Sequence, residues 1–245
     1  MSGLRLVVAP AMPGPWSEAI KGICYVKKLP YTLASFEVGG ENAALKEWSA
    51  QASVPVMAWN DGFPKSTWIE QLCLAERLQP EPSLIPSRIE ERIHFFGYCN
   101  EICGENGFGW CRRLMTIHAF MSVPSGPARD LANYLAPKYG YSAEAAQAAP
   151  GRIATTLRVL ADLLQEQRNK GRRYFMGPSL TALDIYWAAF AALIEPLPND
   201  LCPITEETRG LYRNTNSTVQ AAVNPILMEH RDFIYKQHLE LPIDM

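Results

Sequence analysis

The chain has 245 residues, 48% of them hydrophobic and 20% charged, and 23 Lys and Arg residues nearly balance 25 Asp and Glu residues. This composition is typical of a globular protein, and it excludes a disordered chain, a collagen-like repeat and a disulfide-rich miniprotein. The net charge of −2 also argues against general nucleic-acid binding, because that function needs a basic face that displaces counterions.

The first part of the chain alternates between strand-like and helix-like patterns. A β-branched run predicts a strand at 4–9, and one apolar face predicts a helix at 15–29. A second strand at 31–38, a short helix at 42–50 and a third strand at 55–60 follow, and the third strand ends in the tight turn Asn60-Asp61-Gly62. A short fourth strand then runs to Lys65 and leads into a helix at 66–78. This order predicts a mixed four-stranded sheet between helices.

Residues 79–88 contain three prolines, which predicts a linker, and every later pattern is helical. The clearest of these helices is predicted at 152–167 from its apolar spacing. The most specific pattern begins at Thr181, which fits a capping box with Asp184, while Leu180 and Ile185 fit a hydrophobic staple. The sequence behind this start, IYWAAFAALI, is apolar on every face and predicts a helix that is buried on all sides.

Six cysteines occur at uneven spacings without a Cys-x-x-Cys pair. A structural zinc site at Cys99, Cys103 and Cys111 would need a fourth ligand, and the nearest histidine, His118, lies in the next helical segment. The alternative is that the thiols pack as small hydrophobic side chains. We expect the second case: free thiols, no metal, and a cytoplasmic protein that does not enter a membrane.

Two short motifs in the first part of the chain suggest a binding site. Pro55 follows Val54 at the start of a predicted strand, where a missing amide is tolerated and the peptide bond can be cis. Further along, Ser66 falls at the start of a predicted helix, where a hydroxyl and free amides can bind a carboxylate. Taken alone, Pro55 only opens a strand and Ser66 only caps a helix.

Together with the layout, these motifs resemble the glutathione transferase superfamily over nearly the whole chain. The matching motifs are Val54-Pro55, Lys65-Ser66 and the capping box of Thr181 and Asp184. The resemblance implies an α/β thioredoxin-like domain with a mixed four-stranded sheet at residues 1–79, a linker at 80–88, and an all-α substrate-binding domain at 89–245. It also implies a homodimer.

The resemblance further implies that glutathione binds as a co-substrate along the first domain. The Val54 backbone would pair with the cysteinyl unit, and Lys46 would meet the glycine carboxylate. The family usually has an acidic residue or Gln where this chain has Lys65, and a cation there would repel the ammonium group of glutathione but could pair with its glutamyl carboxylate. The implied glutathione contacts are Trp16, Lys46, Val54, Pro55, Lys65 and Ser66.

The residue that activates the thiol is the main departure from the family. The family places a Tyr, Ser or Cys in the loop after the first strand, but the equivalent position here is Pro13 or Gly14. Neither residue can donate a side-chain hydrogen bond. Ser17, just inside the first helix, is therefore the candidate that lowers the thiol pKa together with the helix N-terminus.

The second substrate would lie between the two domains. Glycines at 104, 107 and 109 each weaken a helix by about 1 kcal/mol, so a kink there would widen the pocket. The expected pocket residues are Met12, Tyr98, Phe108, Trp110 and Arg113.

These features favour a glutathione transferase-like enzyme that conjugates or reduces a small hydrophobic electrophile. The alternative is a non-catalytic ligand-binding or interaction protein of the same fold, which Pro13-Gly14 and Lys65 both suggest. A thiol–disulfide reductase ranks last, because Cys24 lies too deep in the first helix.

Overall fold

The computed structural model describes residues 2–244. The first part of the chain contains a three-stranded sheet. Strand β1 (Leu4–Val8) lies in the centre, parallel to β2 (Tyr31–Ser35) and antiparallel to β3 (Val56–Trp59). The register places Leu6 between Leu33 and Met57. Leu6 and Met57 are fully buried. Arg5 alone interrupts the apolar run of β1, and the other four residues are buried, as expected for a central strand with both faces covered.

The prediction of a fourth strand is wrong for the described chain. After β3 the chain returns only as a single antiparallel bridge, in which Met57 N donates to Lys65 O at 2.9 Å and Lys65 N donates to Met57 O at 2.7 Å. The next hydrogen-bonded pair would join Pro55, which has no amide, to Thr67, which already caps the next helix. The sheet therefore ends at β3, with one bridge at its edge.

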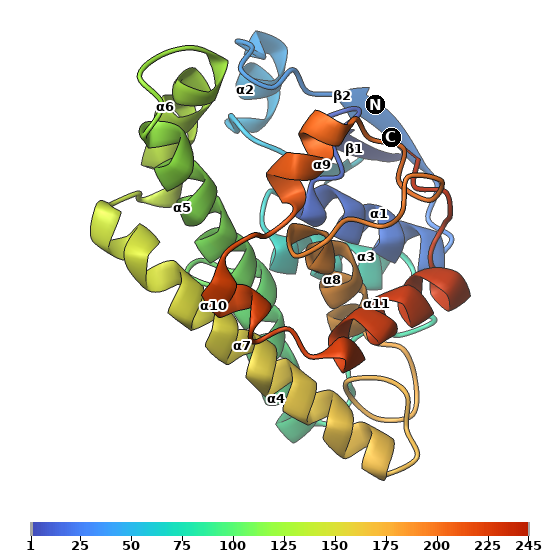
Figure 1. Cartoon of the computed structure of the whole chain (residues 1–245). Helices are drawn as coiled ribbons and strands as arrows, with labels where there is room; N and C mark the ends of the chain where they lie inside the picture. Colours follow the sequence, from blue (N-terminus) through green and yellow to red (C-terminus); the bar gives the residue numbers. More distant parts are fainter. Residues whose placement is uncertain (1, 245) are drawn as a thin grey trace.

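Helices cover both sides of this sheet. Helix α1 (Pro15–Val26) packs against α3 (Trp68–Leu78) and against the central helix α8. Helix α2 (Ala43–Ser49) buries none of its residues, and its Trp48 lies under the Arg5 guanidinium, 4.9 Å from the ring centroid. The α2 region is thus the outermost layer of the first part of the chain (Figure 1).

The rest of the described chain is helical, in agreement with the sequence pattern. Figure 1 shows α7 as a long helix beside α4 and α5, with α8 in the interior. Helix α7 extends further in both directions than predicted, and Ser142 caps its earlier start by accepting a hydrogen bond from Ala145 N at 3.1 Å. No described helix is both long enough and apolar enough to cross a membrane. The remaining elements are α4 (Ile89–Cys103), α5 (Phe108–Met121), α6 (Pro127–Tyr139), α7 (Ala143–Asn169), α8 (Ala182–Phe190), η1 (Ala191–Leu193), α9 (Glu206–Tyr212), α10 (Ser217–Gln220) and α11 (Pro225–His238).

Two predictions for helix α8, its burial on all sides and its capping box, are confirmed. Every residue of the helix is buried, and Thr181 and Asp184 form the capping box. The Asp184 carboxylate also accepts a hydrogen bond from Phe175 N and lies beside His230 of α11. One carboxylate therefore joins the start of α8 to the preceding loop and to the closing helix.

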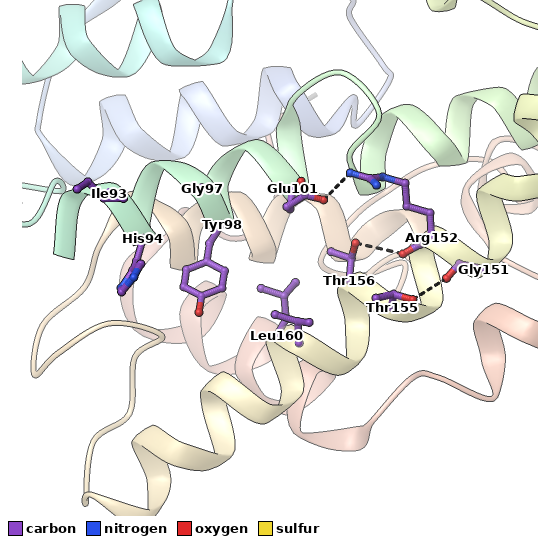
Figure 2. A pocket seen from close by; sticks show the side chains of 11 residues that line it. Ile93, His94, Gly97, Tyr98, Glu101, Gly151, Arg152, Thr155, Thr156 and Leu160 are labelled. Carbon is purple, nitrogen blue, oxygen red and sulfur yellow. Dashed lines mark hydrogen bonds and ion pairs between the residues drawn. The ribbon is translucent and has the colours of Figure 1, made fainter. Parts of the chain in front are cut away.

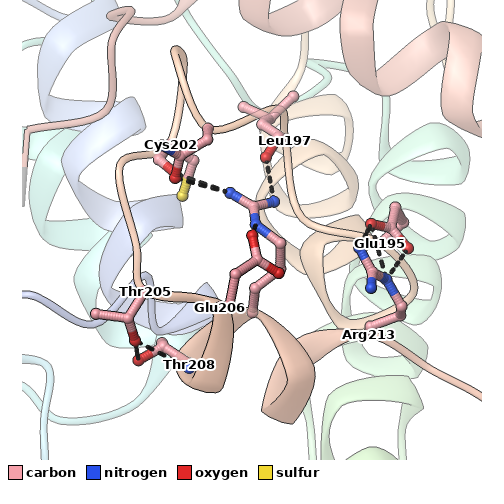
Figure 3. A network of polar contacts seen from close by, with 9 residues as sticks. Glu195, Leu197, Cys202, Thr205, Glu206, Thr208 and Arg213 are labelled. Atoms are coloured by element: carbon pink, nitrogen blue, oxygen red, sulfur yellow. Dashed lines mark hydrogen bonds and ion pairs between the residues drawn. The ribbon is translucent and has the colours of Figure 1, made fainter.

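Helix α9 is held by a network of polar contacts with the loop that precedes it (Figure 3). The buried Arg209 donates to Leu197 O at 2.7 Å and to Cys202 O at 3.1 Å, and Arg213 forms a bidentate pair with Glu195. Arginine suits this position because its planar fork can satisfy several carbonyl oxygens at once. The network fixes the helix that carries Tyr212.

Candidate functional site

A cavity of about 150 Å³ lies between the sheet-containing part of the chain and its helices. On one side it is lined by Ala9, Met12, Gly14, Trp16, Ser17, Phe36, Val38, Ser53 and Val54. On the other side it is lined by Arg113 of α5, by Leu131, Tyr134, Leu135, Lys138 and Tyr139 of α6, and by Tyr212 of α9. Larger depressions of about 610 and 630 Å³ adjoin α4. The smaller cavity is the stronger candidate, because a helix N-terminus, unpaired backbone groups and cations converge there.

The first turn of α1 forms one wall of the cavity. Gly14 is the N-cap and Pro15 the first helical residue, which is a favoured start because proline lacks the amide that would be left unpaired. Ser17 is buried and lines the cavity, next to amides that the helix leaves without intrahelical partners. This turn can therefore present a hydroxyl and a partial positive charge to an anion such as a thiolate.

Trp16 is fixed by contacts that cross to the helical part of the chain. Its Nε1 donates to Cys103 O at 2.9 Å, and its ring meets Phe190 edge-on with centroids 4.8 Å apart. Gly109 of α5 lies so close that an added Cβ would stand 2.4 Å from the Phe190 ring. The close approach of α5 to Trp16 and Phe190 therefore requires glycine at this position.

The segment before β3 offers an unpaired backbone to the cavity. The Val54–Pro55 peptide bond is cis, as the sequence allowed. Gln71, a buried side chain that the sequence analysis did not single out, donates to Pro55 O at 3.0 Å and to Lys65 O at 3.1 Å. Neither backbone group of Val54 bonds to another described residue, so both remain available to an extended peptide.

Helix α3 begins at Trp68, two residues later than the predicted range of 66–78. Thr67 is the N-cap, and Glu70 completes a capping box, with its carboxylate 2.8 Å from Thr67 Oγ1 and 3.3 Å from Thr67 N. Ser66 precedes the cap, and Lys65 lies 3.8 Å from the Glu70 carboxylate. Glu70 thus already occupies part of the helix N-terminus that was expected to receive a carboxylate.

The cavity brings together only some of the residues selected from the sequence. Met12, Trp16, Ser17, Val54 and Arg113 line it. Four residues expected to contact glutathione lie outside its lining: Lys46, Pro55, Lys65 and Ser66.

Three residues expected in the substrate pocket point elsewhere. Phe108 is completely buried against Trp187, with ring centroids 5.9 Å apart. Trp110 Nε1 donates to the backbone oxygen of Tyr139 at 3.0 Å, and Tyr98 lines the separate groove between α4 and α7. The chain does break between α4 and α5, at Gly104 and Gly107, but this break delivers Phe108 to the core instead of widening a pocket.

The helical wall carries polar residues that no sequence motif marks. Lys138, Tyr139 and Tyr212 come from α6 and α9, far from Arg113 in the sequence. Arg112, next to Arg113, donates to Leu193 O at 2.9 Å and to Tyr212 O at 3.2 Å, and so ties α9 to α5. The cavity-lining residues of α5, α6 and α9 come together only because these three helices pack against one another, and the spacing of residues along the sequence does not indicate that packing.

The cysteines are packed side chains. All six are free, and all except Cys73 are buried. Burial raises the pKa of Cys24 to about 12 and raises the pKa values of Cys99 and Cys103 well above that of an exposed thiol. Because the thiolate is the reactive form, none of these three is suited to be a nucleophile.

Comparisons with known proteins identify the fold. No protein-family model matches the sequence, and no curated protein matches it. A glutathione S-transferase from Methylobacillus flagellatus with glutathione bound is 12% identical, covers 96% of this chain and 95% of its own, and superposes with a TM-score of 0.66. A second, from Methylobacterium radiotolerans in complex with glutathione sulfonate, is 16% identical, with coverages of 96% and 91% and a TM-score of 0.63.

The beta-etherase LigF from a Sphingobium species is also similar. It is 16% identical, covers 94% of this chain and 99% of its own, and has a TM-score of 0.59. The similarity in each case spans the sheet, the segment after it and the helices. The chain therefore has the fold of the glutathione transferases.

Proposed function

We propose that the protein is a glutathione transferase-like enzyme that conjugates or reduces a small hydrophobic electrophile. The observation that carries this proposal is the cavity in which the unpaired Val54 backbone meets the first turn of α1. In this proposal residues 1–79 bind glutathione, residues 80–88 connect, and residues 89–245 supply the wall for the second substrate. The solved structures with this fold that hold glutathione or its sulfonate support the choice of co-substrate.

Glutathione would extend from the cavity toward the start of α3. Its cysteinyl unit would pair with the Val54 backbone and place the sulfur near Ser17. Its glutamyl carboxylate would reach Ser66 and Lys65, where it would compete with the Glu70 carboxylate for the helix N-terminus. Its glycine carboxylate would meet Lys46, which is exposed on α2.

The site would act mainly by raising the thiolate fraction of glutathione. A free thiol has a pKa near ~8.5, so little thiolate is present at neutral pH. The Ser17 hydroxyl and the N-terminus of α1 would stabilise the negative sulfur and lower that pKa. The thiol proton leaves to solvent, the sulfur forms a bond to the electrophilic carbon, and the leaving group departs with the bonding electron pair.

Titration calorimetry with reduced glutathione tests the binding step. We expect saturable binding that Ser66→Ala weakens about tenfold, because a hydrogen bond to a charged group contributes roughly 1.5–3 kcal/mol. Ser87→Ala, a change at an exposed serine of the linker, is the matched control and should leave the affinity unchanged. Absence of binding at millimolar glutathione would contradict the proposal.

Turnover with a simple aryl halide tests the chemical step in the same proposal. Ser17→Ala should leave glutathione affinity unchanged and lower kcat at least tenfold, because the hydroxyl acts on the sulfur and not on the peptide. An unchanged kcat for Ser17→Ala would exclude the hydroxyl from thiol activation and assign that role to the backbone amides of α1.

A ligand-binding protein without turnover is the second candidate. It is favoured by the Glu70 carboxylate at the start of α3 and by the absence of a side-chain donor at Pro13 and Gly14. In that case the cavity would bind apolar ligands, and no conjugation would be measured with any electrophile.

We also propose that the protein is a homodimer that pairs through the outer face of α4 and α7. Figure 2 shows the groove between these helices, where Arg152 and Glu101 form an ion pair at 2.9 Å. Ile89 and Ile93 on α4 are 63% and 64% exposed, and Val159 on α7 is 46% exposed. Apolar side chains gathered around one groove are typical of a surface that another protein covers.

Light scattering after size exclusion checks the dimer. We expect a dimer at micromolar concentration and a monomer for Ile93→Glu, because the buried interface would then contain an unpaired charge. Ile93 is exposed within one chain, so the substitution should not unfold it. A wild-type monomer at micromolar concentration would overturn the proposal.

A further inference from the structure

Positive charge gathers on the helical wall of the cavity without a carboxylate to balance it. Arg113 and Lys138 line the cavity, and none of the described residues that line it is acidic. Neither cation forms an ion pair within the described chain. The buried Arg112 behind them donates only to two backbone oxygens and adds a third positive charge. The nearby Glu18 is already paired with Lys21 at 3.0 Å.

The tyrosines around Arg113 cannot neutralise it. Burial raises the pKa values of Tyr139 and Tyr212, so both are uncharged phenols at neutral pH. Burial alone would lower the pKa of Arg113, but its interactions with Tyr139 and Tyr212, which include side-chain hydrogen bonds, outweigh this effect and raise that pKa. The guanidinium therefore stays charged, and the wall stays electropositive.

The proton of the buried Tyr212 hydroxyl lacks an acceptor. Tyr212 is 2% exposed, and the Arg113 guanidinium is the side chain that faces its oxygen, where it interacts as a hydrogen-bond donor. The Arg113 guanidinium is close enough to act on the pKa of this phenol, but arginine only donates hydrogen bonds. The Tyr212 proton therefore still needs an acceptor. A buried polar group left unpaired costs about 1–3 kcal/mol, which a ligand with an acceptor oxygen would recover.

The rest of the cavity is apolar and small. Met12, Trp16, Phe36, Leu131 and Leu135 form its walls. A cavity of about this volume holds a single benzene ring. The preferred ligand would thus combine one aromatic ring with an acidic group at the helical wall, while its other end faces Ser17 and Val54.

We propose that the second substrate is a single-ring aromatic electrophile that carries a carboxylate or sulfonate, and that Arg113, Lys138 and Tyr212 bind this acidic group. The reaction rests on the proposed function, whereas binding of the acid does not. Glutathione itself carries carboxylates and is the other source of the same chemistry.

Calorimetry without glutathione separates these cases, with 4-chloro-3-nitrobenzoate and its methyl ester as the matched ligands. We expect the acid to bind at least tenfold more tightly than the ester. Arg113→Gln should remove this preference, and Tyr212→Phe should reduce it several-fold with little loss of stability, because the hydroxyl proton has no acceptor in the free protein. Arg158→Gln, at an exposed position of α7, is the control for the loss of one positive charge.

The pH dependence gives an independent readout of Lys138. Partial burial, together with the charge of Arg113, lowers the pKa of Lys138 to about 8. Lys138→Met should therefore weaken binding of the acid at pH 7 and change it little at pH 9, where the wild-type lysine is mostly neutral. Arg113 remains charged at both pH values.

Three outcomes would overturn the inference: equal affinity for acid and ester, a preference for the acid that survives Arg113→Gln, or weaker glutathione binding by Arg113→Gln without any acid preference. The last result would assign the cations to a glutathione carboxylate. Tight binding of the acid by a protein that does not bind glutathione would instead refute the proposed function and leave this site standing.

Discussion

Replacement of Asp184 by alanine is expected to destabilise the protein by about 3–5 kcal/mol. The carboxylate is completely buried. It accepts hydrogen bonds from Phe175 N, Thr181 N and Thr181 Oγ1, each at 2.9 Å, and His230 Nε2 lies 2.9 Å from it. Alanine would leave these buried donors unpaired and would remove the cap of α8 in the same step.

Guanidinium-induced unfolding followed by circular dichroism measures this loss. Thr181→Ala removes only the hydroxyl of the cap and should cost about 1 kcal/mol. Asp184→Asn keeps one acceptor and the shape of the side chain, so it should fall between the two. Asp162→Ala, at an exposed position of α7, is the control and should have little effect. A loss below about 1 kcal/mol for Asp184→Ala would contradict this account of the network.

The same network bears on the candidate site through helix α8. Phe190 at the end of α8 supports the Trp16 ring, and Trp16 lines the cavity. Helix α8 also packs along α1, whose first turn presents Ser17. Loss of Asp184 should therefore disorder the site, although no residue that lines the cavity is substituted.

Features of the fold that depend on neighbouring residues could be predicted from the sequence. The capping box at Thr181 is set by two residues one turn apart, and the burial of α8 follows from an apolar composition on every face. The cis bond before Pro55 and the start of α1 after Gly14 are also local. The fourth strand was predicted wrongly. The pattern around Lys65 indicates an extended chain, but it does not indicate how many hydrogen bonds that chain forms with the sheet.

Only one wall of the candidate site could be predicted from the sequence. Its first wall comes from the two loops that carry Met12 and Val54, which have recognisable motifs. Its second wall depends on how α5, α6 and α9 meet, and the side chains there belong to ordinary amphipathic helices. Phe108 illustrates the limit: its place near a glycine-rich break suggested a pocket, but the direction of the chain after the break sends it into the core.

Replacement of Lys27 by methionine is the second change with a large expected effect, about 3 kcal/mol of stability. Lys27 is 1% exposed, and its ammonium lies 2.6 Å from the Glu76 carboxylate. It also donates to Gln79 O and Pro82 O, both at 2.8 Å. The residues predicted as a linker are thus tied to the end of α1, the helix whose first turn forms one wall of the cavity.

Methionine keeps the volume of the side chain but leaves both carbonyl oxygens without their donor. It also leaves the Glu76 carboxylate without its cation, with the hydrogen bond from Leu84 N as its remaining backbone contact. The double variant Lys27→Met/Glu76→Gln should recover part of the loss, because no unpaired charge then remains. Chemical unfolding gives the free energies, and limited proteolysis should cut residues 79–88 faster in the single variant than in the wild type. Arg77→Met, at an exposed position of α3, removes a positive charge from the same helix and should change neither measurement. If Lys27→Met unfolds like the wild type and its linker is no more sensitive to protease, the buried pair does not hold the two parts of the molecule together.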